Sequence, residues 1–128
     1  MFTDHPFFST FAVRDLDAAR AFYGETLGLD VADDPMGMLL VRGADGSTVT
    51  VYPKPDHEPA VFTVLNFPVA DLELAVDALI VNGVEMEHYD NEWMTTDAKG
   101  ILRDERGPAI AWFRDPSGNI LSVIEERG

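Results

Sequence analysis

Residues 11–23, FAVRDLDAARAFY, return in altered form at residues 67–79, FPVADLELAVDAL. The two stretches share Phe, Val, Asp and Leu at matching places, so that Phe11 corresponds to Phe67 and Asp15 to Asp71. In both, a short extended run precedes an Asp in a helix-capping position, and apolar residues follow at helical spacing. Self-similarity of this kind indicates duplicated structural units, so we predict that the chain contains one such unit twice.

Each copy predicts one strand, one helix and three further strands. In the first copy the helix is expected over residues 16–27, and the strands over residues 7–13, 29–32, 38–42 and 48–52. In the second copy the helix is expected over residues 72–81, and the strands over residues 61–69, 84–89, 110–114 and 120–125. This order predicts an α+β fold made of two βαβββ modules.

The length of 128 residues predicts a single domain, residues 1–128, that holds only these two modules. Module one is expected over about residues 7–53 and module two over about residues 61–126. The three prolines within residues 53–60 predict a semi-rigid linker between the modules. Module two also contains a long loop without regular structure, about residues 88–108, which is either a binding loop or a plain surface excursion.

The charge of the chain limits its partners. With 9 Lys and Arg against 23 Asp and Glu, the formal net charge is −14, which argues against binding to nucleic acid or to an anionic membrane surface. The absence of Cys excludes disulfides, thiol nucleophiles and thiolate metal sites. No apolar run reaches the length of a membrane span, and the first residues do not form a signal peptide. We therefore expect a cytoplasmic protein.

Two motifs resemble a known family. Residues 15–29, DLDAARAFYGETLGL, and residues 115–121, DPSGNIL, are similar to the vicinal oxygen chelate superfamily, which includes glyoxalase I, extradiol dioxygenases, epimerases and the bleomycin-resistance proteins. The resemblance covers nearly the whole chain. It implies that the paired modules form curled mixed sheets around a cleft, with helices on the outer face. One architecture serves several chemistries in this superfamily, so the resemblance says more about the fold than about the function.

The resemblance also implies four strand positions that hold a divalent ion in the metal-using members, two in each module. Distances from the matching motifs place these positions at Phe8, Thr50, Val64 and Ser122. None of the four offers an imidazole or a carboxylate, and a hydroxyl alone is a poor ligand for a divalent transition metal. We therefore expect no metal at these positions and no cofactor. One other cluster stays open, because alternation could bring His88, Asp90 and Glu92 to one face of an extended segment.

Strand alternation extends the candidate cleft. Phe11 and Phe67 are expected under the helices, so the alternate residues of the same strands are expected to face the cleft. Trp112 and Phe113 must point to opposite faces, and the pattern leaves open which of them joins the cleft. Trp93, in the long loop, is a candidate apolar cover. The candidate ligand-binding residues are Phe8, Thr10, Thr50, Val64, Asn66, Trp93, Trp112 and Ser122.

The sequence thus predicts a small-molecule-binding protein of the glyoxalase and bleomycin-resistance type that lacks the usual metal ligands. Two alternatives stay open. One is a lyase, isomerase or dioxygenase of the same superfamily, either metal-free or with a relocated metal, and the other is a regulatory or partner-binding module. No catalytic residue is identified, because the sequence contains no hydrolase, phosphate-loop or dinucleotide signature. A homodimer is expected.

Overall fold

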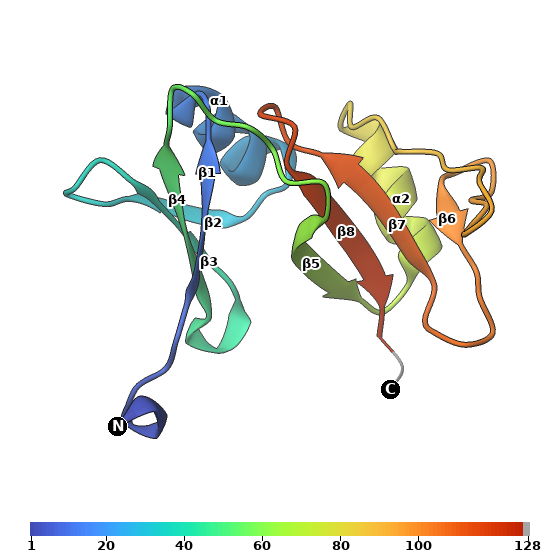
Figure 1. The fold of residues 1–128 in the computed structure, drawn as a ribbon, viewed down its shortest axis with the longest axis horizontal. Helices are drawn as coiled ribbons and strands as arrows, with labels where there is room; N and C mark the ends of the chain where they lie inside the picture. The colour runs from blue at the N-terminus through green and yellow to red at the C-terminus, as the bar shows by residue number, and fades with distance from the viewer. Residues whose placement is uncertain (127–128) are drawn as a thin grey trace. The chain divides into compact units, whose positions relative to one another are not determined.

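The computed structural model describes residues 1–126 and divides the chain into two compact units, Met1–Glu58 and a second that begins at Pro59. Each unit contains a four-stranded mixed sheet and one main helix, in the chain order β-α-β-β-β (Figure 1). The predicted α+β class and the predicted pair of βαβββ modules are therefore confirmed. No helix in the described part of the chain is long and apolar enough to cross a membrane.

The first unit has strand order β1-β4-β3-β2, with β1 parallel to β4 and the other neighbours antiparallel. Its main elements are β1 (Ser9–Val13), α1 (Leu16–Ala21), the π-helical turn η2 (Phe22–Thr26), β2 (Asp30–Asp33), β3 (Leu39–Arg42) and β4 (Thr48–Pro53). Two short 3-10 turns, η1 (Phe2–Asp4) and η3 (Ala44–Gly46), precede β1 and β4.

The second unit repeats this arrangement with strand order β5-β8-β7-β6, and here β5 runs parallel to β8. Its elements are β5 (Thr63–Val69), α2 (Leu72–Val81), β6 (Ile101–Leu102), β7 (Ile110–Arg114) and β8 (Ile120–Glu125). Three strands of each unit come from equivalent sequence segments, whereas the edge strand β6 lies within residues 88–108, which the first unit has no counterpart for.

Both helices begin where the capping pattern predicts. The Asp15 carboxylate accepts hydrogen bonds from the backbone N–H groups of Asp17 and Ala18, and the Asp71 carboxylate accepts one from Leu74. These carboxylates satisfy donors that the first turn leaves unpaired. The first helix differs from the prediction near its end, because the Leu27 N–H donates to the Phe22 carbonyl at 2.9 Å and widens the last turn.

The edge of the second sheet corrects the prediction for residues 84–89. Of that segment only Met86 bridges to β7, at Phe113, and the neighbouring edge strand is β6 instead. The expected loop over residues 88–108 therefore contains a strand. The misplaced strand has a physical cause. Val84 and Met86 are buried and alternate with exposed or half-buried Glu, as in a half-buried strand, yet at Ile110 and Ala111 the edge of β7 pairs with β6 instead.

One face of each sheet packs against helix. In the first unit the Phe11 ring lies 6.0 Å from the ring of buried Tyr23 in η2. In the second unit the Glu125 carboxylate accepts a hydrogen bond from the N–H of Leu72, the first residue of α2, which places Glu125 on the helix side. Because side chains alternate along a strand, residues next to Phe11 and Glu125 face the opposite, helix-free side of each sheet.

Candidate ligand-binding site

A row of three side chains crosses the helix-free face of the second sheet. Asn66 on β5 pairs with Ser122 on β8, and Ser122 pairs with Trp112 on β7. Phe113 is fully buried on the other face, which decides the alternative that the sequence left open for these two aromatic residues. Ser122 is fully buried, Trp112 is half-buried and Asn66 is exposed. We call these three residues the 66–122–112 row.

The first sheet carries the equivalent row in its own unit. Thr10 on β1 pairs with Thr50 on β4, and Thr50 pairs with Leu40 on β3. Thr50 is buried and Thr10 is exposed, as their counterparts Ser122 and Asn66 are. The duplication therefore conserves the geometry of the row but changes its chemistry, since the first row has no amide and no aromatic ring.

Hydrogen bonds within the second sheet fix the polar groups of its row. The Ser122 Oγ–H donates to Asn66 Oδ1 across the parallel strand pair. The indole Nε1–H of Trp112 donates to the Thr63 hydroxyl at 3.2 Å. A buried hydroxyl and a part-buried indole N–H each cost free energy unless they are paired, so these two contacts hold the side chains in defined positions.

Strand alternation in the sequence did not identify Thr63 as a residue of the helix-free face. The register of β5 shifts between Thr63 and Leu65, because Thr63 pairs with Ile120 and Leu65 with Leu121. Val64 is the extra residue of this bulge, so simple alternation does not extend from Asn66 to Val64. The Trp112 indole bonds to Thr63, and Thr63 occupies the place on the helix-free face that alternation assigned to Val64. Whether Val64 contacts a ligand stays a prediction.

An aromatic and ionic cluster borders Trp112. The Tyr89 ring meets the Trp112 ring edge to face, with centroids 5.6 Å apart. Burial raises the pKa of the Tyr89 phenol above 10.0, and the nearby Glu87 carboxylate adds to the rise, while the Arg114 guanidinium opposes it. The Arg114 Nε–H donates to Glu87 Oε1, and this bond raises the pKa of Arg114. The phenol is therefore neutral at ordinary pH, and the two charges offset each other.

Phe8 and Trp93 lie outside these rows. Phe8 directly precedes β1, and 65% of it is exposed. Trp93 is 82% exposed in a turn where Asn91 Oδ1 accepts the N–H groups of Trp93 and Met94. Within residues 1–126 the Trp93 ring makes no aromatic contact. The structure therefore brings Asn66, Ser122 and Trp112 together, and Thr10 with Thr50, but it joins neither Phe8 nor Trp93 to a row.

The residues at the family's metal positions do not fit a divalent ion. Thr50 and Ser122 offer only hydroxyls, and the Ser122 hydroxyl already donates to Asn66. Across residues 1–126 no three His, Asp or Glu side chains gather closely enough to hold a metal. The structure thus does not assemble the alternative cluster of His88, Asp90 and Glu92, and Asp90 instead accepts a hydrogen bond from Thr95.

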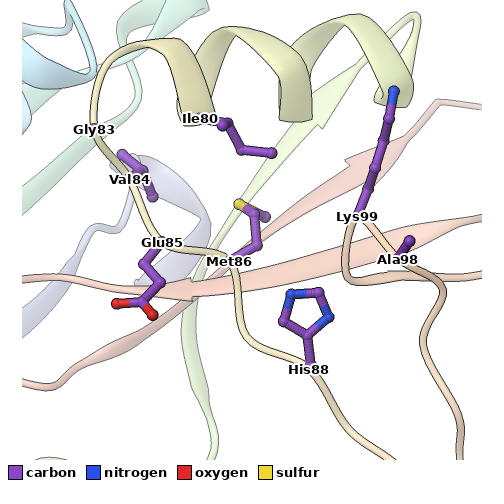
Figure 2. Close-up of a pocket in the computed structure, with 8 residues that line it drawn as sticks. All are labelled: Ile80, Gly83, Val84, Glu85, Met86, His88, Ala98 and Lys99. Carbon is purple, nitrogen blue, oxygen red and sulfur yellow. The ribbon is translucent and has the colours of Figure 1, made fainter.

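A separate hollow of about 380 Å³ lies beside the end of α2 and contains none of the row residues. Buried Val84 and Met86 line it together with Ile80, and Lys99 borders it from the returning loop (Figure 2). The Lys99 ammonium pairs with Asp77 at 2.8 Å, and this bond raises the Lys99 pKa. His88 and Glu85 lie on different sides of the hollow (Figure 2), so its polar groups do not converge on one point.

The fold and the rows define a duplicated α+β protein whose sheets each keep one face free of helix. The chain belongs to the Glyoxalase/Bleomycin resistance protein/Dioxygenase superfamily, whose family model matches residues 4–123. No curated protein matches the sequence.

Solved structures share the fold over almost the whole chain. TnmS3, an antibiotic-binding protein from a Streptomyces species, is 23% identical with a TM-score of 0.69, over 97% of this chain and 98% of that one. A bleomycin-binding protein solved with bleomycin is 21% identical with a TM-score of 0.70, over 96% and 99%. The fosfomycin resistance protein FosX of Listeria monocytogenes is 13% identical with a TM-score of 0.70, over 97% and 94%. At these identities the likeness establishes the fold alone.

Proposed function

We propose that this protein binds a small, partly apolar molecule on the helix-free face of its second sheet, without the divalent ion that metal-using relatives hold. The 66–122–112 row carries the proposal, because it combines a half-buried indole ring with an exposed amide whose position is fixed by a buried hydroxyl. An apolar surface with a few oriented polar groups is the usual lining of small-molecule sites.

The chemistry of the metal positions supports binding without a metal. Phe8 and Val64 have no donor atom, and the hydroxyls of Thr50 and Ser122 are weak ligands in the absence of imidazole or carboxylate partners. Solved relatives of the same fold include proteins described as binding an antibiotic and as binding bleomycin, and sequestration of a drug-like compound is the corresponding role for this chain. The net charge of −14 favours cationic over anionic compounds at long range.

The first test asks whether the purified protein holds a metal. The protein is purified without added metal, its metal content is measured by elemental analysis, and it is then titrated with nickel, manganese, zinc and ferrous salts in a calorimeter. We expect no tight site at one metal per chain. One equivalent of tightly bound metal would contradict the metal-free proposal.

The second test asks whether the row binds ligand. Calorimetry is carried out with bleomycin and a panel of cationic and aromatic compounds, and each mixture is assayed for product. We expect binding without turnover, and loss of binding in Trp112→Leu, which keeps an apolar residue on β7. Trp93→Phe serves as the matched control and should keep binding. Product formation would favour an enzyme of the same superfamily, and equal binding by Trp112→Leu would exclude the row.

A further inference from the structure

Some polar groups on the helix-free face of the second sheet already make hydrogen bonds within the protein, and others do not. The Trp112 indole N–H is committed to Thr63, and the Ser122 hydroxyl hydrogen is committed to Asn66 Oδ1. The Asn66 Nδ2 amine is different, because it makes no hydrogen bond within residues 1–126 while Asn66 is exposed. Its two N–H groups are therefore available to a ligand, and the carbonyl oxygen of the same amide is the part that the protein holds.

Because the Asn66 oxygen is already bonded within the described part of the chain and its amine is not, the groups of the row that remain available to a ligand are hydrogen-bond donors. The acceptor of the Asn66 amide faces Ser122, and the lone pairs of Ser122 Oγ belong to a residue with no exposed surface. The Thr63 hydroxyl accepts from Trp112, which leaves its own O–H as a further donor. A ligand that offers a hydrogen-bond acceptor would satisfy these groups, whereas a ligand that offers only donors would leave them unpaired.

The charges nearby select an uncharged acceptor. Arg114, the cation beside the row, is bonded to the Glu87 carboxylate and also donates to the Gly118 carbonyl at 3.3 Å. Within residues 1–126 the Arg114 charge is thus already paired with Glu87 rather than free for a carboxylate or phosphonate, and the chain as a whole carries a net charge of −14. An anion would approach against this field and would then lose hydration without an ionic partner.

The aromatic residues Trp112 and Tyr89 favour a ligand with a flat ring. Trp112 is half-buried, and its ring is held by the edge-to-face contact with Tyr89 and by the bond to Thr63. A ring held in this way presents a flat apolar surface that reaches Thr63 on β5, the strand that also carries Asn66, and it loses little side-chain freedom on binding.

We propose that the ligand of the second sheet is a planar aromatic compound with an uncharged carbonyl, whose ring lies against Trp112 and whose oxygen accepts from Asn66 Nδ2. This inference rests on the proposed function, since it names the class of compound for the same face. It assigns Asn66 as the residue that determines specificity, in that it distinguishes a carbonyl from an anion or a hydrocarbon of equal shape.

Three probes with one ring system test the inference: 2-acetylnaphthalene with an uncharged carbonyl, 2-ethylnaphthalene without an acceptor, and 2-naphthoate with a negative charge. The Trp93→Phe variant is used throughout, because the chain has two tryptophans and this change leaves Trp112 as the only indole N–H signal in NMR titrations. We expect the ketone to bind about five- to tenfold more tightly than the ethyl compound, as one uncharged hydrogen bond would give.

The decisive variant is Asn66→Asp in this background. It has the same shape and keeps an acceptor for Ser122, but it replaces both free N–H donors with a carboxylate oxygen. We expect it to lose the five- to tenfold preference for the ketone while the ethyl compound binds as before. Asn91→Asp is the matched control, since it adds the same charge where an Asn side chain also serves as an acceptor, and it should keep the preference.

The possible failures are distinguishable. Equal binding of the ketone and the ethyl compound, tightest binding of 2-naphthoate, or an unchanged preference in Asn66→Asp would overturn the inference and leave a ligand site at Trp112. If none of the three probes moves the Trp112 signal while bleomycin or another panel compound does, the aromatic carbonyl class is wrong. If no compound moves that signal, the proposed function fails together with the inference.

Discussion

Trp112 and Leu40 occupy equivalent places in the two sheets, yet they give the two helix-free faces different properties. Each pairs with a buried hydroxyl residue, Ser122 or Thr50, on the neighbouring strand. Trp112 adds a ring and an N–H that must be paired, and Thr63 supplies the acceptor. The aromatic character of the second face therefore depends on Trp112 together with Thr63.

Tyr89 provides a test at the level of one ionisable group. Its folded-state pKa lies above 10.0, while the unfolded chain has the ordinary value, so the unfolded state loses the phenol proton first as the pH rises. Linkage then requires that the contribution of Tyr89 to stability is complete below pH 10 and is lost progressively above it. We expect Tyr89→Phe to lose less stability than the natural protein between pH 9 and pH 11.

Urea denaturation followed by circular dichroism at several pH values would measure this difference. Phe keeps the ring that contacts Trp112, and all other titrating groups are common to both proteins, so their contributions cancel. Parallel loss of stability in the two proteins would show that the Tyr89 phenol does not retain its proton in the folded state.

For single residues, the sequence predicted the helix caps better than the sheet face toward which a strand side chain points. Asp15 and Asp71 could be assigned as caps because a cap depends only on its near neighbours. Trp112 and Phe113 could not be assigned to faces, since both are large and apolar and alternation alone has no absolute direction. Thr63 was missed because a bulge adds one residue without changing the composition of the strand.

At the scale of elements, local patterns predicted the two helices and seven of the eight strands of residues 1–126 within a few residues. The predicted 72–81 helix matches α2 exactly in its bounds, and the predicted 110–114 and 120–125 strands match β7 and β8. The edge of the second sheet failed, because β6 has only two residues, and pairing at a sheet edge depends on which distant segment arrives there. No local periodicity carries that information.

The cap of α2 gives a prediction at this scale. Asp71→Ala removes the acceptor for the Leu74 N–H and should lower the free energy of unfolding by about 1 kcal/mol. Asp71→Asn is the matched control, because Asn caps as well as Asp and should stay close to the natural protein. Urea denaturation monitors both variants. If Ala and Asn destabilised equally, the charge of Asp71 rather than its hydrogen bond would be the source of its effect.

At the scale of the whole molecule, the internal duplication was the sequence feature from which the fold could be predicted best. Two copies of one pattern fixed the number of helices, the order of the strands and the class of the fold, and the family model over residues 4–123 agrees. The candidate site was harder to predict from the sequence, because the residues that form a row are set by the register between strands that are distant in sequence. Ser122 and Asn66 were both anticipated, but their hydrogen bond was not.

The exposed apolar residues near the start of each unit lead to a prediction about assembly. Phe7 is 95% exposed, Val61 is 93% exposed and Phe62 is 65% exposed. Burial of such side chains stabilises an interface by about 25 cal/mol per Å² of apolar surface, so we expect these residues to pair two copies of the chain. Light scattering should give twice the 14.1 kDa of one chain.

Variants distinguish a specific dimer interface at these residues from non-specific hydrophobic association. Phe7→Glu combined with Phe62→Glu should give a monomer by light scattering. Met36→Glu changes another highly exposed apolar residue, 83% exposed in a loop, and should remain a dimer. A natural protein that scatters as a single chain at all concentrations would rule out the homodimer.

The bulge in β5 also matters to anyone who would engineer this scaffold. Grafting a coordinating imidazole by aligning motifs would alter residue 64, one step out of phase with the ladder. The productive change would be at Thr63, where the existing hydroxyl already sits beside Ile120 and meets the indole of Trp112. One extra residue in β5 thus separates the position that motif alignment suggests from the position that pairs with β8.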